Sequence, residues 1–148
     1  MDSYSASGQI TACTPAPGDT ALGVIASALT RGKIHYFMVS AGGVAADNVL
    51  AWLVRRFTAT GSYTPVTPTP LDGGGPAAQM LAGEQFTVEP TFTLTLFELS
   101  VHQRSLFQWN ATPGREIVIP ATSGAGVGVT PTHGSYVGQA EAVVHWQE

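Results

Sequence analysis

Charged side chains are scarce in this sequence. Asp, Glu, Lys and Arg make up 11% of its 148 residues, against about 25% in an average soluble domain. Six Lys and Arg are outnumbered by ten Asp and Glu, which gives a formal net charge of −4. This balance argues against a nucleic-acid partner, because such binding needs a basic face that displaces counterions. An exterior with so few charges is instead typical of a protein that packs against neighbours.

Cysteine and long apolar runs are also rare. Cys13 is the only cysteine, so no internal disulfide can form, and we expect its side chain to be buried. No stretch approaches the ~18 consecutive apolar residues of a membrane span, which predicts no membrane partner. The first residues lack the basic and apolar regions of a signal peptide, so we expect the product to stay in the cytoplasm in which it is made.

Motifs of catalysis and cofactor binding are missing as well. There is no G-x-S-x-G elbow and no P-loop, and no predicted helix follows the glycine-rich run 124–128 to bind a phosphate. The histidines fall in different predicted elements without the close paired spacing of a zinc site; they are His35, His102, His133 and His145. We therefore predict that the protein is not an enzyme and uses no metal or cofactor.

The sequence does contain short runs with the periodicity of β-strands. In Thr91–Trp109, apolar and polar side chains alternate on both sides of a polar turn at 102–104, which we interpret as a hairpin. The apolar phase switches at Leu96-Phe97, which predicts either a β-bulge or a strand buried on both faces. Residues 33–40 and 47–58 predict a second hairpin. Further strands are predicted at 9–13, 115–120, 127–130 and 138–148.

Three other stretches are less regular. Residues 21–29 fit helical spacing, but Gly23 and the stop at 30–32 favour a strand. Residues 59–90 are rich in Pro, Gly and Thr, which predicts a long loop with at most one helical turn, at 77–81. Long loops of this kind tend to contact partners. The small, polar residues 1–8 predict a flexible N-terminal arm, and residues 15–18 a turn.

Together these patterns predict an all-β fold. About eight or nine strands separated by Gly, Pro and Thr turns are typical of an antiparallel β-sandwich, most naturally a jelly roll with a long Thr/Pro/Gly-rich loop. We expect one such domain at 9–148, preceded by the arm at 1–8. Trp52, Trp109 and Trp146 lie at strand positions, where a core or subunit-interface role is favoured over stacking on a sugar.

Several motifs occur in an order that carries a family resemblance. They are the strand 47–58 with its Arg-Phe-Thr ending, Leu71-Asp72-Gly73 and Pro76-Ala77-Ala78 after the Thr/Pro loop, Glu89-Pro90-Thr91 before the long strand, the stretch 99–109, and Pro113-Gly114-Arg115-Glu116 leading into 117–121. This order resembles tailed-bacteriophage virion structural proteins of the jelly-roll capsid decoration, or cement, type. The resemblance covers about two thirds of the chain, from Asp47 to the end.

The resemblance implies a non-enzymatic virion component made in the host cytoplasm. It would be a homotrimer on the outside of the head, where it binds the major capsid protein lattice and stabilises it. A tail or baseplate subunit and a glycan-binding module on the virion surface remain alternatives. We expect contacts with partners in the arm, the loop and the polar tip, at Asp2, Ser3, Tyr4, Tyr63, Pro65, Pro68, Pro70, His102, Gln103 and Arg104.

Overall fold

A computed structural model describes residues 1–13, 19–132 and 135–148 of the chain. Within these residues every helix or strand element is a β-strand: β1 Ser3–Ile10, β2 Leu22–Ile25, β3 Gly32–Gly42, β4 Val49–Phe57, β5 Ser62–Val66, β6 Thr69–Pro70, β7 Leu81–Val88, β8 Phe92–His102, β9 Leu106–Asn110, β10 Ile117–Ile119, β11 Gly126–Thr132 and β12 Gln139–Gln147. No described segment forms a helix able to cross a membrane. The predicted turn at 15–18 and His133 lie outside the described residues. The predicted all-β class is confirmed.

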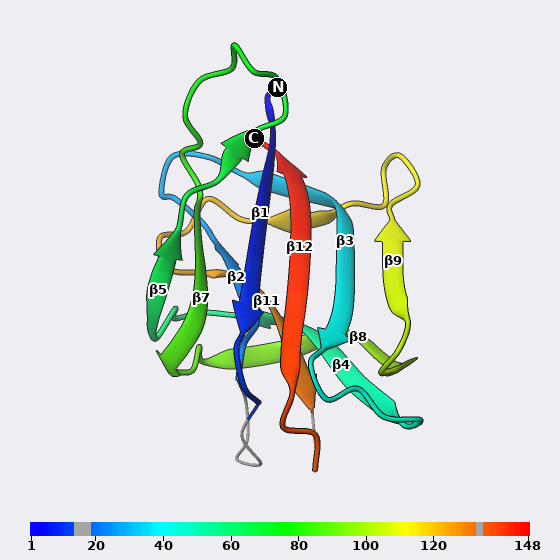
Figure 1. Cartoon of the computed structure of the whole chain (residues 1–148). Coiled ribbons are helices and arrows are strands. Elements are labelled where there is room, and N and C mark those ends of the chain that lie inside the picture. The colour runs from blue at the N-terminus through cyan, green and yellow to red at the C-terminus, as the bar shows by residue number, and fades with distance from the viewer. Residues whose placement is uncertain (14–18, 133–134) are drawn as a thin grey trace.

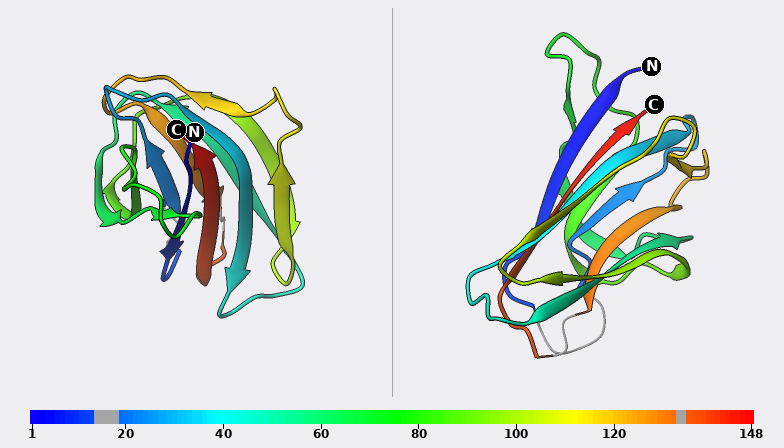
Figure 2. Two further views of the ribbon diagram at one scale, coloured as in Figure 1. Left: turned by 90° about the horizontal axis from the view of Figure 1, so that it is seen from above. Right: turned by 90° about the vertical axis from the view of Figure 1, so that its right-hand side faces the viewer.

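The strands form two antiparallel sheets that pack face to face (Figures 1 and 2). The front sheet has the order β10-β3-β12-β1-β6, with β9 also paired to β3. The back sheet has the order β5-β7-β2-β11-β4-β8. Inward-facing side chains of both sheets fill the space between them, with Trp52, Trp146 and Tyr4 among the largest fully buried ones. The antiparallel β-sandwich predicted from the strand patterns is therefore also confirmed.

The early strands pair with the late strands in reverse order. β1 pairs with β12, β2 with β11, β3 with β9 and β10, and β4 with β8. Both hairpins predicted from the sequence are wrong, because β3 and β4 lie in different sheets, and so do β8 and β9. The physical reason is that alternation fixes which face of a strand is buried, but not which strand it pairs with.

Several local predictions are confirmed. Residues Leu22–Ile25 form a strand rather than a helix. In the β4–β8 ladder, Val54 pairs with Phe97 and Arg55 with Thr95, so Leu96 is the extra residue of a β-bulge. Cys13 is buried.

The predicted N-terminal arm is wrong. Residues Ser3–Ile10 form β1, which lies between β12 and β6 inside the front sheet. Tyr4 is 2% exposed, and its ring stacks on Trp146 with 6.0 Å between the centroids. The outward positions of β1 carry small polar residues, so its alternation is weak in hydrophobicity even though its inward positions belong to the core.

The predicted loop at 59–90 is largely wrong too. It contains β5, β6 and β7, and residues 77–81 form no helical turn. Prolines are tolerated here because β5 and β6 are the outermost strands of their sheets, where Pro65 and Pro70 can lack a backbone N–H without breaking an interior ladder. The longest stretch without a strand is 71–80, and it projects beyond the sandwich at the top of Figure 1.

Candidate interaction surface

One side of the sandwich, formed by β8 and β9, is open; we call it the open side. β8 is the last strand of the back sheet and pairs only with β4, while β9 borders the front sheet and pairs only with β3. No strand in the described parts of the chain covers their outer edges, and Figure 1 shows β9 at the right-hand border of the molecule. The outer edges of both strands therefore present backbone N–H and C=O groups that a further strand could pair with.

β8 carries few of the features that protect an edge strand. Glu98 is the only Asp, Glu, Lys or Arg in its 11 residues, and it has no proline. Its exposed positions are mainly Thr, Ser and leucine, with Leu94 62% exposed. Natural edge strands are usually guarded by charges, prolines or bulges. β8 has the single charge of Glu98 and two register shifts against β4, at Leu96 and at Thr93. The edge of β8 is therefore suited to pairing with, or packing against, another chain.

Four aromatic rings lie between β8 and β9, and we call them the open-side cluster. They are Phe37, Phe97, Phe107 and Trp109. The ring centroids of Phe37 and Phe97 are 5.6 Å apart, and those of Phe97 and Trp109 are 5.2 Å apart. Phe37 is fully buried, but the other three are only half-buried. Partly exposed aromatic rings of this kind are typical of protein interfaces.

The predicted polar tip, residues 102–104, lies at the end of the open side where β8 leads into β9. Arg104 Nη1 lies 3.0 Å from Asp47 Oδ1, and both side chains are exposed. Gln103 is instead buried: its Oε1 accepts a hydrogen bond of 2.9 Å from the backbone N–H of Ala46, and its own backbone N–H donates to Asn48. The side chain of Gln103 therefore holds the tip against the β3–β4 connection, and its predicted role as a partner contact stays a prediction.

The other predicted contact residues lie away from this tip. The backbone N–H of Leu71 donates to Ser3 O, and Tyr4 pairs with Pro70, so the N-terminal residues and the loop do lie together, at the opposite end of the molecule from the tip (Figure 1). The ring of Tyr4 is in the core, and its predicted role as a contact stays a prediction. Asp2 and Pro65 are exposed, and Ser3, Tyr63, Pro68 and Pro70 are half-buried.

A second aromatic group, which we call the closed-side cluster, lies on the outer face of the back sheet and has members from β4, β5, β7 and β8. It consists of Phe57, Tyr63, Phe86 and Phe92. The rings lie directly over glycines: a Cβ atom on Gly23 would come within 2.8 Å of Phe86 Cζ, and one on Gly128 within 2.9 Å of Phe92 Cε1. Glycine at these positions lets the aromatic rings cover the sheet.

Polar groups tie this closed side together. Glu89 accepts hydrogen bonds from Thr20, at 3.0 Å from the backbone N–H and 2.5 Å from Oγ1, and Thr20 Oγ1 lies 3.2 Å from Thr130 Oγ1. Burial raises the pKa of Glu89, while the hydrogen bonds from Thr20 lower it. Arg55 Cζ lies 3.6 Å from the ring centroid of Phe92, and burial lowers its pKa. These contacts join four segments of the chain and stabilise the closed side.

Among the described residues, the other titratable side chains are scattered over the fold and form no group of metal ligands. His35 and His145 approach with 6.2 Å between ring centroids, and burial lowers the pKa of His145. No three His, Cys, Asp or Glu side chains among the described residues gather as metal ligands. Comparison with protein families, curated proteins and solved structures found no match. The geometry of the open side is accordingly the strongest indication of what this chain does.

Sequence reasoning named the stretch 91–109 but missed its surface. It selected the tip residues His102 and Arg104, not the half-buried Phe107 and Trp109 or the exposed Leu106. The available signal was a run of 11 residues with one charged side chain, followed at once by further aromatic residues. The sequence left Trp109 between a core and a subunit-interface role, because alternation alone does not show that both strands are at sheet edges.

Proposed function

We propose that this chain is a non-enzymatic structural protein of a tailed-phage virion, a capsid decoration protein that packs against other protein chains through its open side. The observation that carries this proposal is the uncovered edge of β8 beside the half-buried open-side cluster. The phage setting is supported by the sequence resemblance from Asp47 onward and by the low content of charged residues. Low charge matters because it reduces the desolvation cost of a large protein contact.

The jelly-roll form of the sandwich belongs to this proposal. It is supported by the reverse-order pairing of β1–β4 with β12, β11, β9/β10 and β8, which is a long antiparallel ribbon wound into two layers. β5, β6 and β7 are then an insertion between β4 and β8 that widens both sheets. Because jelly rolls have many functions, the surface rather than the fold argues for assembly.

Binding would stabilise a head by linkage. A protein that binds the assembled lattice of major capsid protein but not its separated subunits lowers the free energy of the assembled state. We propose that the protein acts as a homotrimer, since three copies held together bind a symmetric lattice with avidity. The open side would form the contact between subunits or the contact with the shell.

The first test is sedimentation with virion parts. Purified protein is mixed with DNA-filled heads stripped of it, with empty precursor shells and with isolated tails, and each mixture is separated on a gradient. Saturable co-sedimentation with heads is the expected result and gives the copy number. Binding to tails alone would replace this proposal with a tail or baseplate role, and binding to none of the three would overturn the virion proposal.

A matched pair of variants tests whether the open side makes the contact. Leu106 is 58% exposed at the start of β9, and Leu29 is 86% exposed in the connection between β2 and β3. Leu106→Lys places a charge in the proposed contact and should abolish head binding, whereas Leu29→Lys should leave it unchanged. Light scattering of the same proteins reports whether the trimer is lost as well. Equal binding by both variants would contradict the assignment of the open side.

A glycan-binding role is the second candidate, favoured by the half-buried Trp109 in the open-side cluster. A sugar stacked on this ring would change its fluorescence, as aromatic stacking is a common mode of sugar contact. The measurement is tryptophan fluorescence across a broad glycan panel, with Trp109→Phe as the control. Saturable quenching that the control lacks would support this candidate, and no quenching would remove it.

A further inference from the structure

We propose that two copies of this chain join through β8, which pairs with β8 of a second copy in an antiparallel ladder about a two-fold axis at Leu99. The inference rests on the proposed role of the open side as a contact with other chains, and it names one such partner. The back sheets of the two copies would become one continuous sheet. Since a two-fold contact is complete with two chains, it is separate from the contact within the proposed trimer and would join neighbouring trimers on a shell.

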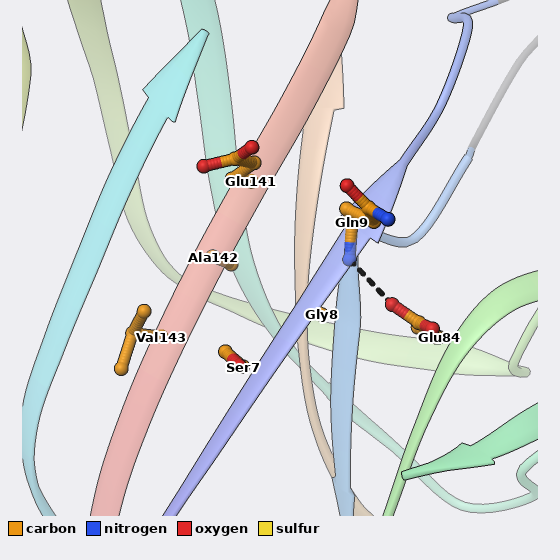
Figure 3. A pocket seen from close by; sticks show the side chains of 7 residues that line it. All are labelled: Ser7, Gly8, Gln9, Glu84, Glu141, Ala142 and Val143. Carbon is orange, nitrogen blue, oxygen red and sulfur yellow. Dashed lines mark hydrogen bonds between the residues drawn. The ribbon is translucent and has the colours of Figure 1, made fainter. Parts of the chain in front are cut away.

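The other sheet edges of the described chain are shorter or obstructed. β10 has three residues, β9 has five, and β5 has five of which one is Pro65. At the far edge of the front sheet, β6 pairs with β1 at Tyr4 and Ser5. Farther along β1, Glu84 Oε2 of β7 accepts the backbone N–H of Gln9 at 2.8 Å, as Figure 3 shows, and so occupies that edge. β8, with 11 residues, is the longest uncovered edge strand among the described residues.

Part of β8 directs unpaired backbone groups to its free edge. From Phe97 to His102, each residue of β8 faces one residue of β4 without a register shift. Just beyond, the N–H of Gln103 donates to Asn48 O at 2.9 Å and so points toward β4. Backbone groups alternate in direction along a strand. The N–H and C=O of Glu98 and Ser100, an odd number of residues earlier, therefore point away from β4, where a second chain can pair with them.

The two ends of this free segment limit the length of any added ladder. At one end, the register shift at Leu96 interrupts the regular strand. At the other end, the C=O of His102 already accepts the N–H of Ser105 at 2.8 Å in the turn that leads to β9. The segment between these ends is 97–101, and its central residue is Leu99. Antiparallel pairing with its own copy therefore places Leu99 opposite Leu99.

This register is also the one that the charges favour. With the axis at Leu99, Glu98 of each copy faces Ser100 of the other, and each such pair exchanges two backbone hydrogen bonds. An axis at Glu98 would place two carboxylates directly opposite each other, which destabilises a strand pair. An axis at Ser100 would need the carbonyl of His102, which the turn already uses. Only the axis at Leu99 uses free backbone groups and keeps the like charges from facing each other.

The side chains of the segment suit a copy of itself. Phe97 and Leu99 are half-buried and Val101 is buried, and all three lie opposite inward-facing residues of β4. In the pair, Phe97 of one copy faces Val101 of the other and the two Leu99 side chains meet, so a row of apolar side chains continues across the axis. Aromatic and β-branched side chains form favourable cross-strand pairs. On the outer face, the hydroxyl of Ser100 can donate to the carboxylate of Glu98 in the other copy.

Cysteine cross-linking measures this register directly. Glu98 and Ser100 are exposed, so Glu98→Cys and Ser100→Cys should fold normally, and the unchanged Cys13 is buried and gives the background. The full-length variants are treated with oxidised glutathione, singly and as an equal mixture, and covalent dimers are counted on a denaturing gel. The mixture should cross-link several times faster than either variant alone. Facing residues have Cα atoms about 5.5 Å apart, which suits a disulfide, whereas diagonal neighbours are ~7–8 Å apart.

Three outcomes of the cross-linking would overturn the proposed pairing. The first is no dimer above the level of the protein that carries Cys13 alone, at the highest concentration that stays soluble. The second is an equal rate in all three samples, which indicates random collision. The third is faster cross-linking by one variant alone than by the mixture, which indicates another register.

A matched pair of variants at Ser100 tests the backbone contact. Ser100→Pro removes an N–H that the fold does not use, and edge strands tolerate proline at such positions, whereas Ser100→Ala keeps the N–H. In sedimentation equilibrium, the proline variant should weaken association through β8 by about tenfold, the effect of losing two hydrogen bonds in a symmetric contact. The alanine variant should change it little. Equal association by both variants would contradict strand pairing.

None of these measurements contains a capsid, so they separate this inference from the proposed function. A chain that cross-links as expected but does not bind heads would contradict the virion proposal and leave the pairing in place. A chain that binds heads but does not cross-link would overturn the pairing and assign the edge of β8 to the shell.

Discussion

Both sides of this sandwich carry a cluster of aromatic side chains, but the two clusters differ in how the rings are covered. On the closed side, Phe57 and Phe86 are buried while Tyr63 and Phe92 are half-buried, and the rings lie over glycines of the back sheet. On the open side, Phe107 and Trp109 are half-buried, and no described strand covers the edge of β8. The insertion of β5, β6 and β7 extends the sheets away from β8 and β9, and it supplies Tyr63 and Phe86 to the closed-side cluster. Aromatic rings therefore serve folding on one side and, in our proposal, assembly on the other.

The largest expected effect is on the closed side. Phe57→Ala should lower the free energy of unfolding by about 4 kcal/mol, because it removes a fully buried ring and leaves a cavity beside Phe92. Phe107→Ala should cost about half as much, since its ring is only half-buried. Urea denaturation of the isolated proteins measures both. Equal losses would show that the open-side cluster is as much a part of the core as the closed-side one.

A smaller effect should appear in the pH dependence of stability. Burial raises the pKa of Glu89 in the folded state, so the folded protein holds this proton more tightly than the unfolded chain. The stabilising contribution is fully present below the unfolded pKa of about 4.3 and is lost as the pH rises through the raised folded pKa. Unfolding free energies across this window should therefore decline with rising pH.

Glu89→Gln isolates that contribution. The amide keeps an acceptor for Thr20 but does not titrate, so the decline should be shallower in the variant than in the original protein. Because all other groups are unchanged, the difference between the two curves reports on Glu89 alone. Parallel curves would mean that its carboxyl group is well hydrated and that the closed side is less tightly packed than its contacts indicate.

The smallest effect belongs to the tip of the open side. Arg104→Ala removes the 3.0 Å contact with Asp47, whose side chain is 77% exposed. Exposed ion pairs contribute little, so the unfolding free energy should fall by no more than about 0.5 kcal/mol. If head binding is lost at the same time, Arg104 belongs to the proposed contact; a large loss of stability would instead show that the tip is a structural element.

Periodicity predicted most strand positions but not their neighbours. The bulge at Leu96 was visible as a change of apolar phase, and the inward face of β12 as alternation of Ala140, Ala142, Val144 and Trp146. β1 was missed because its outward residues are small and polar, and β5 and β6 were missed because of their prolines. Both failures have one cause. Whether a strand tolerates prolines or small polar residues depends on where that strand lies in its sheet, and the local sequence does not show this place.

The candidate surface was predicted even less completely. The sequence indicated a low-charge chain suited to packing against neighbours, and it pointed to the stretch 91–109. The open side exists only because β8 and β9 end up at the borders of different sheets.

What the sequence by itself determined is therefore the all-β class, the inward faces of the longer strands and the scarcity of charge. Each of these follows from local alternation and composition. Only the tertiary structure decided which strands pair, which edges stay uncovered, and which side chains are buried as a result, as Tyr4 and Gln103 are. The physical reason is that strand pairing joins residues far apart in the chain, and many pairings satisfy the same alternation until the whole core is packed.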